Sequence, residues 1–351
     1  MTLRNPRLRA AVALLILTAA TLTGCASRSS SSTGPLSEAA DAVGNNHPEW
    51  KGFTFTIGDN GGDGSQALAQ MTGVFANAPY KVEFARFTYG PPLVQAAASG
   101  DIDLGAVGDV PTITGAAKEY GFKIVAVERS LTPTQAAENI IVPKGSPIQT
   151  LAQLKGKKIA VPQGSSAHGL VLNALGSVGL TPTDVQLDFL SPAAGATAFA
   201  SGKVDAWAIW NPQSAISIAA GARVLAKGLP PIDQTSSYFI ANDASLDNPT
   251  KRAALIDVLE RLSREFAWAV KNPDKYAQAL VQEDGISLAD AKAAVAADET
   301  RVTPIEPADI TLEQNLSNAF LRADQITTKV DIPQIVDNIL PAGFDSSKET
   351  S

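Results

Sequence analysis

Short apolar runs alternate along this chain with longer segments whose apolar residues recur every three or four positions. Residues 157–161 end in such a run, Ile159-Ala160-Val161, and a polar turn at Pro162-Gln163-Gly164 follows. The next segment has apolar side chains at helical spacing, namely Ala167, Leu170, Val171, Ala174, Leu175 and Val178. This order predicts a strand, a tight turn and a helix that ends near Gly179.

The predicted helix begins with Gly164, Ser165 and Ser166. A helix start has backbone N–H groups without intrahelical partners and the positive end of the helix dipole, and two hydroxyls add further donors. This combination favours an anion-binding site that needs no catalytic group. The alternative is that Ser165 or Ser166 only caps the helix.

An equivalent succession of elements comes earlier in the chain. The hydrophobic pattern predicts strands at residues 53–57, 81–84 and 102–107, and a helix after each of them. A glycine-rich, acidic loop at residues 58–64 follows the first strand. Asp109 and Pro111 suit the first turn of the helix after the third strand.

The succession recurs in the following part of the chain. Ser99-Gly100-Asp101-Ile102-Asp103 matches Ser201-Gly202-Lys203-Val204-Asp205. This register sets Gly108-Asp109 against Trp210-Asn211, and it places Asn60-Gly61-Gly62 near Gly164-Ser165-Ser166. Strands that alternate with helices in this way predict two α/β units with mostly parallel sheets.

Ligands of such open sheets bind beyond the carboxyl ends of the strands, which is where these loops lie. If the two units face each other, four helix starts converge on one cleft, as in a hinged binding protein. The alternative is two unrelated α/β domains with separate sites. We expect the shared cleft because the loops are placed symmetrically.

The N-terminus indicates export. Arg4, Arg7 and Arg9 precede an apolar run at residues 10–22, which is too short to span a bilayer. Leu22-Thr23-Gly24-Cys25 resembles a bacterial lipobox, and Cys25 is the only cysteine. We therefore expect a signal peptide at residues 1–24, a lipid on Cys25 and a flexible tether at residues 25–50.

The composition excludes several classes of partner. The net charge is −7 and becomes about −10 when the three signal-peptide arginines are removed, and no basic patch suggests nucleic-acid binding. With two histidines and one cysteine, a metal cluster of these residues is not expected. The loop from Asp59 lacks acidic residues at two positions that a calcium loop needs, so we expect neither a metal nor a cofactor.

Three runs carry a family resemblance: GDIDLGAVGDVP at residues 100–111, KGKKIAVPQGSSAH at residues 155–168, and VDAWAIWNP at residues 204–212. They are similar to solute-binding proteins of bacterial ABC importers for aliphatic sulfonates, and the relatives that bind nitrate or taurine are more distant. The resemblance implies a two-lobed α/β fold of the type II periplasmic-binding-protein kind, with a ligand cleft between lobes and a membrane permease as partner.

The resemblance also implies a division of the chain. Lobe one would comprise residues 51–139 and 236–341, and lobe two residues 140–235, with a tail at residues 342–351. The strands at residues 139–142 and 238–241 would cross between the lobes as a hinge. We expect a monomer on the outer face of the cytoplasmic membrane, anchored through the lipid on Cys25.

Neutral N–H and O–H donors can hold the delocalised charge of a sulfonate. The expected ligand-binding residues are Asn60, Gly61, Gly62, Gly108, Asp109, Arg129, Gly164, Ser165, Ser166, His168, Trp210 and Asn211. Asp109 would donate its amide while its carboxylate caps the helix, and His168 would be a neutral supporting donor. Arg129 would add positive charge, and its alternative is a solvated surface position.

Strand alternation puts Trp207 and Trp210 on opposite faces. Trp210, at the carboxyl end of its strand, is expected to line the cleft and to form a wall for an alkyl or aryl tail. Trp207 is expected in the core. Helical patterns near residues 255–270, 276–281, 288–296 and 312–326 are expected to cover lobe one.

Two features depart from the family pattern: the glycine-rich, acidic loop at residues 59–64, and Asn211 where an aspartate is common. They leave taurine, nitrate or an aromatic sulfonate open as alternative ligands. An alternative of another class is a lipoprotein hydrolase of a sulfonate or sulfate ester. However, Gly164 to His168 do not match the nucleophile-elbow pattern and no orienting acid follows, so we expect no catalytic residue and no enzyme.

Overall fold

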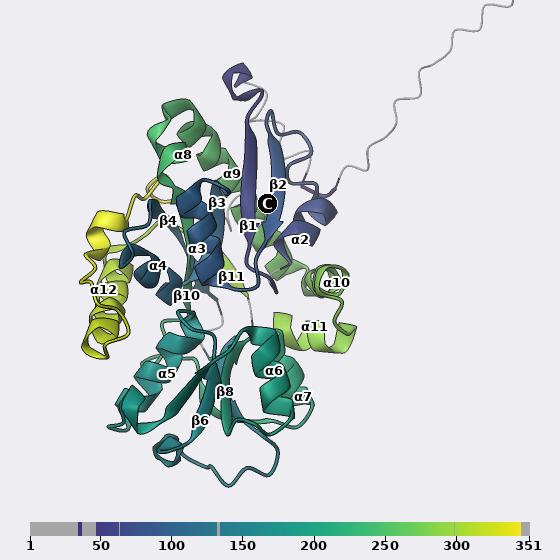
Figure 1. Cartoon of the computed structure of the whole chain (residues 1–351). Helices are drawn as coiled ribbons and strands as arrows, with labels where there is room; N and C mark the ends of the chain where they lie inside the picture. The colour runs from purple at the N-terminus through teal and green to yellow at the C-terminus, as the bar shows by residue number, and fades with distance from the viewer. Residues whose placement is uncertain (1–33, 37–46, 63, 132–133, 298, 345–351) are drawn as a thin grey trace, which may run out of the picture. The chain divides into compact units, whose positions relative to one another are not determined.

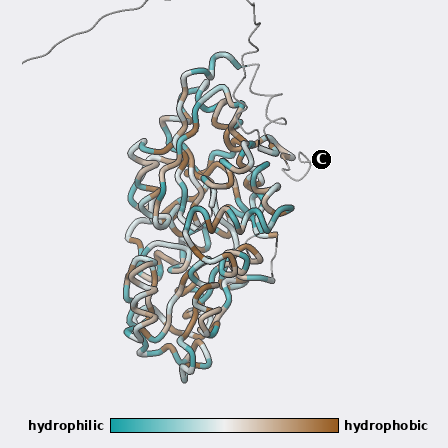
Figure 2. The backbone as a smooth tube through the Cα atoms, turned by 90° about the vertical axis from the view of Figure 1, so that its right-hand side faces the viewer, coloured by the Kyte–Doolittle hydropathy of each residue, from teal (hydrophilic) through white to brown (hydrophobic). Residues whose placement is uncertain are grey.

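Two β-sheets with helices packed around them form the part of the chain that the structure describes (Figure 1). This computed structural model describes residues 34–36, 47–62, 64–131, 134–297 and 299–344. The expected signal peptide and Cys25 lie outside these residues. Figure 2 shows hydrophobic and hydrophilic stretches alternating along the backbone, as expected for elements that each bury one face. The predicted two-sheet α/β fold is confirmed.

The first sheet has six strands in the order β11-β4-β10-β3-β1-β2. Their bounds are β1 (Thr54–Asp59), β2 (Lys81–Arg86), β3 (Leu104–Gly108), β4 (Phe122–Ser130), β10 (Ser236–Asn242) and β11 (Thr300–Thr303). β1 pairs in parallel with β2 and β3, whereas β10 lies antiparallel between β3 and β4.

The second sheet repeats this arrangement with five strands in the order β7-β6-β8-β5-β9. Their bounds are β5 (Glu138–Val142), β6 (Lys158–Val161), β7 (Gln186–Phe189), β8 (Ala206–Trp210) and β9 (Arg223–Lys227). β6 pairs in parallel with β7 and β8, and β5 lies antiparallel between β8 and β9. Both sheets are therefore parallel except for inserted or edge strands.

Each parallel strand leads into a helix at equivalent places of the two sheets. In the first sheet these are α2 (Ser65–Thr72), α3 (Gly90–Ser99) and α4 (Asp109–Ala116). In the second they are α5 (Ser166–Ser177), α6 (Pro192–Ala200) and α7 (Gln213–Ala219). The carboxyl end of a parallel strand thus leads into a helix start six times, as the hydrophobic pattern predicts.

The internal repeat extends to individual hydrogen bonds. The Thr56 amide donates to the Asp103 carboxylate at 2.8 Å, and the Lys158 amide donates to the Asp205 carboxylate at 2.9 Å. Gly100 and Gly202, which precede these aspartates, both have left-handed backbones with φ of 80° and 67°. The register predicted from the two matching pentapeptides is therefore a structural equivalence.

The expected hinge strands do not themselves cross between the sheets. β5 pairs only within the second sheet and β10 only within the first. The chain passes between the sheets in the segments from Ser130 to Glu138 and from Lys227 to Ser236. The two apolar runs were mistaken for the connections because each directly follows one.

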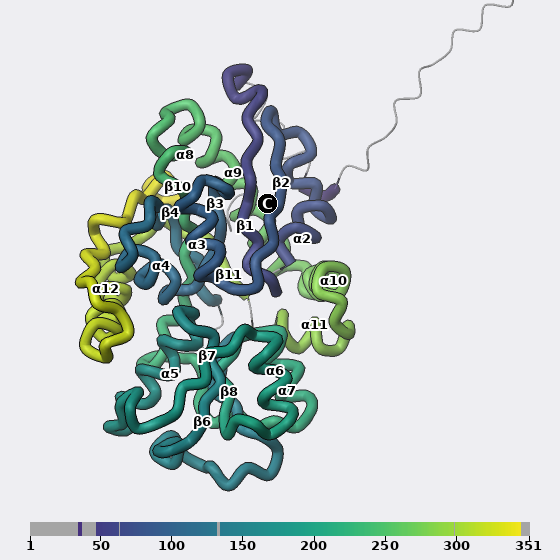
Figure 3. The backbone as a smooth tube through the Cα atoms, viewed as in Figure 1, coloured from purple at the N-terminus to yellow at the C-terminus, as the bar shows by residue number. Residues whose placement is uncertain are grey.

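The C-terminal third contributes five helices and contacts both sheets' helices. They are α8 (Asp243–Asp247), α9 (Pro249–Lys271), α10 (Pro273–Asp284), α11 (Leu288–Val295) and α12 (Pro307–Arg322). The apolar stripe of α9 packs on the first sheet as predicted. However, α12 contacts α5 as well as α4, and α11 contacts α7, so these helices do more than cover lobe one (Figure 3).

Described parts of the expected tether are packed. Leu36 is buried against the end of α2, where its amide donates to the Thr72 carbonyl at 3.0 Å. Trp50, in a short 3-10 turn, is 4% exposed and belongs to the core of the first sheet. The serine-rich composition of this segment predicted a flexible tether, and the two apolar residues Leu36 and Trp50 were not recognised as packed. Ile332–Ile335 form another 3-10 turn.

Candidate ligand-binding site

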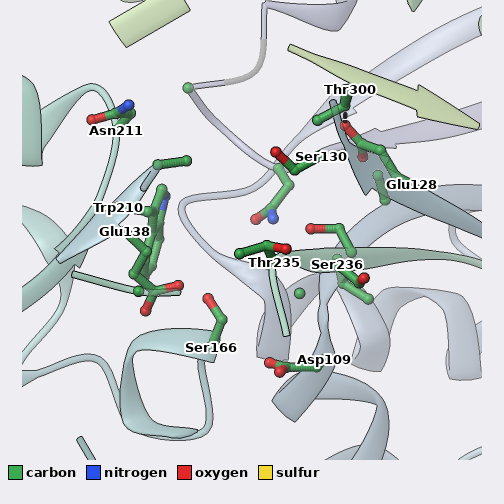
Figure 4. Close-up of a pocket in the computed structure, with 18 of the residues that line it drawn as sticks. Asp109, Glu128, Ser130, Glu138, Ser166, Trp210, Asn211, Thr235, Ser236 and Thr300 are labelled. Atoms are coloured by element: carbon green, nitrogen blue, oxygen red, sulfur yellow. Dashed lines mark hydrogen bonds between the residues drawn. The ribbon is translucent and has the colours of Figure 1, made fainter. Parts of the chain in front are cut away.

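A cavity of about 170 Å³ lies where loops from the two sheets meet (Figure 4). It is lined by the segments that follow β1, β3, β6 and β8, and by the two segments in which the chain passes between the sheets. Phe266 and Tyr276 of the C-terminal helices also line it. The cavity is thus at the carboxyl ends of the parallel strands, where open α/β sheets bind ligands.

The start of α4 approaches the start of α5 very closely. A methyl group added to Gly108 would lie 2.9 Å from Cβ of Ser166, which is closer than real contacts allow. Gly108 has an ordinary extended backbone, so the missing side chain matters here for space rather than for conformation. The glycine allows the two helix starts to meet at the cavity.

The glycine-rich loop after β1 makes a second close approach. Gly62 has φ of 106°, and a methyl group on it would lie 3.0 Å from Cδ of Pro212. A methyl group added to Gly61 would lie 2.6 Å from the Phe87 carbonyl oxygen. Two of the loop's glycines are therefore explained by close approaches, that of Gly62 to the loop after β8 and that of Gly61 to the residue after β2.

The structure brings together nine of the twelve residues predicted for the site. They are Asn60, Gly61, Gly62, Gly108, Asp109, Ser165, Ser166, Trp210 and Asn211. Trp210 lines the cavity, whereas Trp207 is 1% exposed and packs beside Phe199 in the core. The alternation along β8 therefore separated the two tryptophans correctly.

Arg129 does not line the cavity. Its guanidinium forms two hydrogen bonds to the Asp309 carboxylate of α12, and its Nε donates to the Thr303 hydroxyl at 3.0 Å. The expected positive charge is therefore committed to an ion pair on the other side of the strand. Sequence could not show this because Asp309 is far along the chain.

Gly164 and His168 also lie outside the cavity lining. The Gly164 amide donates to Nδ1 of His168 at 3.3 Å, so this amide is not directed at a ligand. His168 is 2% exposed between the rings of Phe189 and Phe320, each 5.2 Å away. Burial lowers the pKa of His168 to about 4, which agrees with the expected neutral imidazole. His168 therefore supports the turn before α5 by accepting the Gly164 amide, whereas a donor role was expected.

The two serines of the α5 start differ. The Ser165 hydroxyl donates to the Pro162 carbonyl at 2.7 Å, so its side chain does not cap the helix. Ser166 points into the cavity toward Glu138 (Figure 4). Of the two hydroxyls, that of Ser166 is therefore the one at the cavity wall, where it donates to the Glu138 carboxyl.

Asn211 joins the second sheet to α11. Its side-chain amide donates to the Ala294 carbonyl at 3.2 Å, and its Oδ1 accepts from the Ala215 amide at 3.2 Å. An aspartate could make only the second of these bonds, because a carboxylate has no donor. The departure from the family pattern at this position thus creates a contact between the two halves of the site.

Several lining residues were missed, and most of them carry carboxyl or hydroxyl groups. They are Glu128, Ser130, Gln135, Glu138, Asp233, Thr235, Ser236, Ser237 and Thr300. The polar residues at the starts of β5 and β10 could have indicated Gln135, Glu138 and residues 233–237, whereas Glu128, Ser130 and Thr300 carry no such signal. Thr235 has a positive φ of 55°, which is a strained conformation for a β-branched residue and is characteristic of functional sites.

Buried carboxyls dominate the electrostatics. Burial, and next the neighbouring Asp233, raises the pKa of Asp109 to about 8, although its carboxylate accepts the Val110 amide at 2.8 Å. The same two causes raise the pKa of Glu138 well above its usual range. Burial raises the pKa of Asp233 as well. The expected anion site thus has acids on its walls.

In the described part of the chain, no three or more histidine, cysteine, aspartate and glutamate side chains are grouped so that they could hold a metal ion. None of the described helices combines the length and apolarity needed to cross a membrane.

Comparisons with known proteins agree with this geometry. The family described as NMT1/THI5 like matches residues 67–276. The putative aliphatic sulfonates-binding protein of Escherichia coli (strain K12) is 36% identical over 262 residues, which cover 72% of this chain and 78% of that protein.

Two solved structures share the fold over most of the chain. The alkanesulfonate-binding protein SsuA from Xanthomonas axonopodis pv. citri, bound to MOPS, has a TM-score of 0.75 and 29% identity, over 82% of this chain and 99% of that one. The periplasmic aliphatic sulphonate binding protein SsuA from Escherichia coli has a TM-score of 0.72 and 30% identity, over 83% and 94%. The family resemblance predicted from the three sequence runs is confirmed.

Proposed function

We propose, because the chain belongs to the NMT1/THI5-like family and is similar to sulfonate-binding proteins, that it captures a small sulfonate in the cavity between its two sheets. In this proposal the protein is the extracytoplasmic solute-binding component of an ABC importer. It delivers the sulfonate to the membrane permease and does not change it chemically.

The observation that carries the proposal is the meeting of the α4 and α5 starts at one cavity, with Gly108 against Ser166. A ligand in this place touches loops of both sheets, so binding favours the closed arrangement of the two lobes over an open one. A permease can then distinguish the loaded protein from the empty one by its shape.

Neutral donors supply the expected contacts to the sulfonate oxygens. Ser166, Ser236 and Ser237 line the cavity, and so does the glycine-rich loop at residues 60–62. Hydroxyls can rotate to donate to an anion. The indole of Trp210 provides an apolar wall for the carbon chain.

The proposal keeps two expectations from the sequence that concern residues outside the described ranges. Residues 1–24 act as a signal peptide, and Cys25 carries the lipid that anchors the protein to the outer face of the cytoplasmic membrane. The protein acts as a monomer, and the expected lobe division is kept except that Glu138 and Asn139, which lie in β5, belong to lobe two.

Calorimetric titration of the soluble protein from Ala26 onward tests the function. The ligands are ethane-, butane- and octanesulfonate, taurine, benzenesulfonate, nitrate and sulfate. Saturable heat is expected with a sulfonate, and Ser166→Ala is expected to weaken binding roughly tenfold because one hydrogen bond to a charged group is lost. Ser177→Ala is the matched control, since that hydroxyl donates to the Ala174 carbonyl at the other end of α5.

The order of the ligand affinities shows which tail length the cavity accepts. Tighter binding of nitrate than of every sulfonate would change the proposed ligand class. Absence of heat with all of them would contradict the proposal. Chromatography of the incubated ligands separates capture from turnover, because a hydrolase of sulfonate or sulfate esters would release a product.

A further inference from the structure

Glu138 lies at the cavity wall with one carboxyl oxygen unused. Its side chain is 9% exposed, and its Oε1 has no hydrogen-bond partner among the described residues. The other carboxyl oxygen accepts from the Ser166 hydroxyl, and Figure 4 shows the carboxyl directed toward that serine. A buried oxygen without a partner at a cavity wall indicates a partner that arrives with the ligand.

Two further acids lie near Glu138 at this wall. Asp109, at the start of α4, is 6% exposed and lies beyond Ser166 in Figure 4. Asp233, in the segment before β10, also lines the cavity, and its carboxylate accepts the Thr235 amide at 2.6 Å. If all three carboxyls were ionised, they would repel one another and any anion that enters the cavity.

The cavity lining contains no cation that could balance these acids. None of the described lining residues is lysine, arginine or histidine. The charged or titratable groups on the surrounding elements are Glu128 and Arg129 of β4, His168 of α5, Tyr238 of β10, Tyr276 of α10, and Asp309 and Glu313 of α12.

These surrounding groups supply no free positive charge. Arg129 forms two hydrogen bonds to the Asp309 carboxylate, so its charge is already compensated. His168 is neutral near pH 7, because burial lowers its pKa to about 4. Glu128 and Glu313 are themselves acids. In the described part of the chain no side chains are grouped to hold a metal ion, so the counter-charge that remains is a proton from the solvent.

We propose that Glu138 and Asp109 hold the captured sulfonate as neutral carboxylic acids, each of which donates its O–H to a sulfonate oxygen. This inference rests on the proposed sulfonate-binding function and assigns the groups that recognise the anion. Each carboxylate gains one O–H bond with a proton from the solvent, and no covalent bond of the ligand changes. A sulfonate is the anion of a strong acid and stays ionised, so the proton is carried by the protein.

The hydrogen bonds of both side chains fit the neutral form. In Glu138, the oxygen that accepts from Ser166 keeps that bond while Oε1 carries the proton. In Asp109, Oδ1 accepts the Val110 amide at 2.8 Å, which leaves Oδ2 for the proton. Burial, and next the neighbouring Asp233, raises the pKa of both carboxyls, to about 8 for Asp109. The acids can therefore retain protons near neutral pH.

Proton linkage gives the affinity a predictable response to pH. Because the sulfonate binds the protonated acids, the affinity should fall as the pH rises above about 7, by at most roughly tenfold per pH unit for each proton taken up. Full-length protein in detergent and the soluble protein from Ala26 onward are titrated with ethanesulfonate and butanesulfonate between about pH 6 and about pH 9.5 at constant ionic strength. Titrations in Tris and in bicine, which differ in ionisation enthalpy and lack a sulfonate group, measure the proton uptake.

Amide variants distinguish a donor from a negative charge. Glu138→Gln and Asp109→Asn offer an N–H donor at every pH, so each should lose part of the pH dependence and the double variant most of it. At about pH 9 each should bind butanesulfonate roughly tenfold more tightly than the wild type does. Glu138→Ala removes charge and donor together and should bind about tenfold more weakly than Glu138→Gln at every pH. Asp247→Asn, an exposed position of α8, controls for net charge, and circular dichroism checks that every variant is folded.

The outcomes separate the inference from the function. A wild-type affinity that does not change with pH, without proton uptake, would overturn the inference and would leave sulfonate capture standing. A wild-type pH profile in the double variant would also overturn it. So would equal binding by Glu138→Ala and Glu138→Gln, because the acid would then act only by repulsion. Failure of every sulfonate to bind at any pH would contradict the proposed function and the inference together.

Discussion

The segment after β3 and the segment after β8 occupy equivalent places in the two sheets, yet their side chains make different contacts. The first presents Asp109, whose buried carboxyl faces other acids. The second presents Asn211, whose amide reaches across to α11. The same backbone arrangement therefore places a buried carboxyl in one half of the site and a hydrogen bond to another helix in the other half. The repeated backbone fixes the positions of these side chains, whereas the residue type at each position fixes the contacts that it makes.

The largest effect is expected where the two halves touch. Gly108→Ala puts a methyl group 2.9 Å from Cβ of Ser166, so the starts of α4 and α5 cannot stay this close without displacement. Such overpacking costs about 1–3 kcal/mol, so ligand affinity should fall roughly tenfold to a hundredfold. Titration measures the affinity, and small-angle scattering measures closure.

Gly176→Ala is the matched control, because a methyl group there meets no atom within 4 Å. Adding Ser166→Gly to Gly108→Ala removes the clash and should restore the wild-type scattering profile, while the affinity stays below that of the wild type because the Ser166 hydroxyl is lost. Wild-type affinity in Gly108→Ala alone would show that ligand binding does not require this contact.

A somewhat smaller effect is expected when the second loop is made like the first. Asn211→Asp removes the donor to the Ala294 carbonyl and faces that carbonyl with a carboxylate, whereas the bond from Ala215 is kept. Leaving a buried acceptor unpaired costs about 1–3 kcal/mol. Titration should therefore show weaker ligand binding.

Asn173→Asp tests whether this effect is specific, because Asn173 also donates to a backbone carbonyl, that of Ile232, away from α11. It should lower the melting temperature more than the ligand affinity. Equal losses of affinity in the two variants would argue against Asn211 as a contact between the halves.

The reverse exchange, Asp109→Asn, is expected to change the pH dependence of stability. Because the folded-state pKa of Asp109 is raised to about 8 from 3.8, the folded protein holds a proton that the unfolded chain releases. The stabilisation is complete below about pH 4 and is lost as the pH rises through about 8, with a slope of at most about 1.4 kcal/mol per pH unit for one proton. Asp109→Asn should flatten this decline.

Urea unfolding of the ligand-free protein between about pH 5 and about pH 9 measures the slope. Asp247→Asn, on the exposed end of α8, should leave the wild-type slope unchanged. A decline that is as steep in Asp109→Asn as in the wild type would assign the proton to Glu138 or Asp233 instead.

The smallest effect concerns the support of the α5 start. The pKa of His168 is lowered to about 4 from 6.5, so its contribution to stability is present above about pH 6.5 and is lost as the pH falls through about 4. His168→Phe should reduce this acid sensitivity. It should cost about 1 kcal/mol near neutral pH, because the Gly164 amide loses its acceptor.

Chemical unfolding at a series of acidic pH values provides the measurement. His47→Phe, at the only other histidine, is the comparison and should retain the acid sensitivity. An unchanged acid transition in His168→Phe would mean that other groups govern it.

Hydrophobic periodicity was sufficient to locate most elements. The three-four spacing that begins at Ala167 correctly located α5, and the pentapeptides ending in Asp103 and Asp205 correctly paired the two halves. These predictions succeeded because a strand or helix is specified by neighbouring residues, which the sequence displays in order. The two halves carry the same local pattern.

The chemistry of the cavity could not be predicted in the same way. Arg129 was expected to add positive charge to the site, but in the structure it pairs with Asp309. The α5 start was expected to hold an anion, but the Glu138 carboxyl faces it. The partners that decide charge and donor availability are distant in sequence. The sequence by itself determined the two α/β units, their register and the family. Only the tertiary structure decided which loops meet and that three carboxyls share one wall, because electrostatics depends on distances in space rather than along the chain.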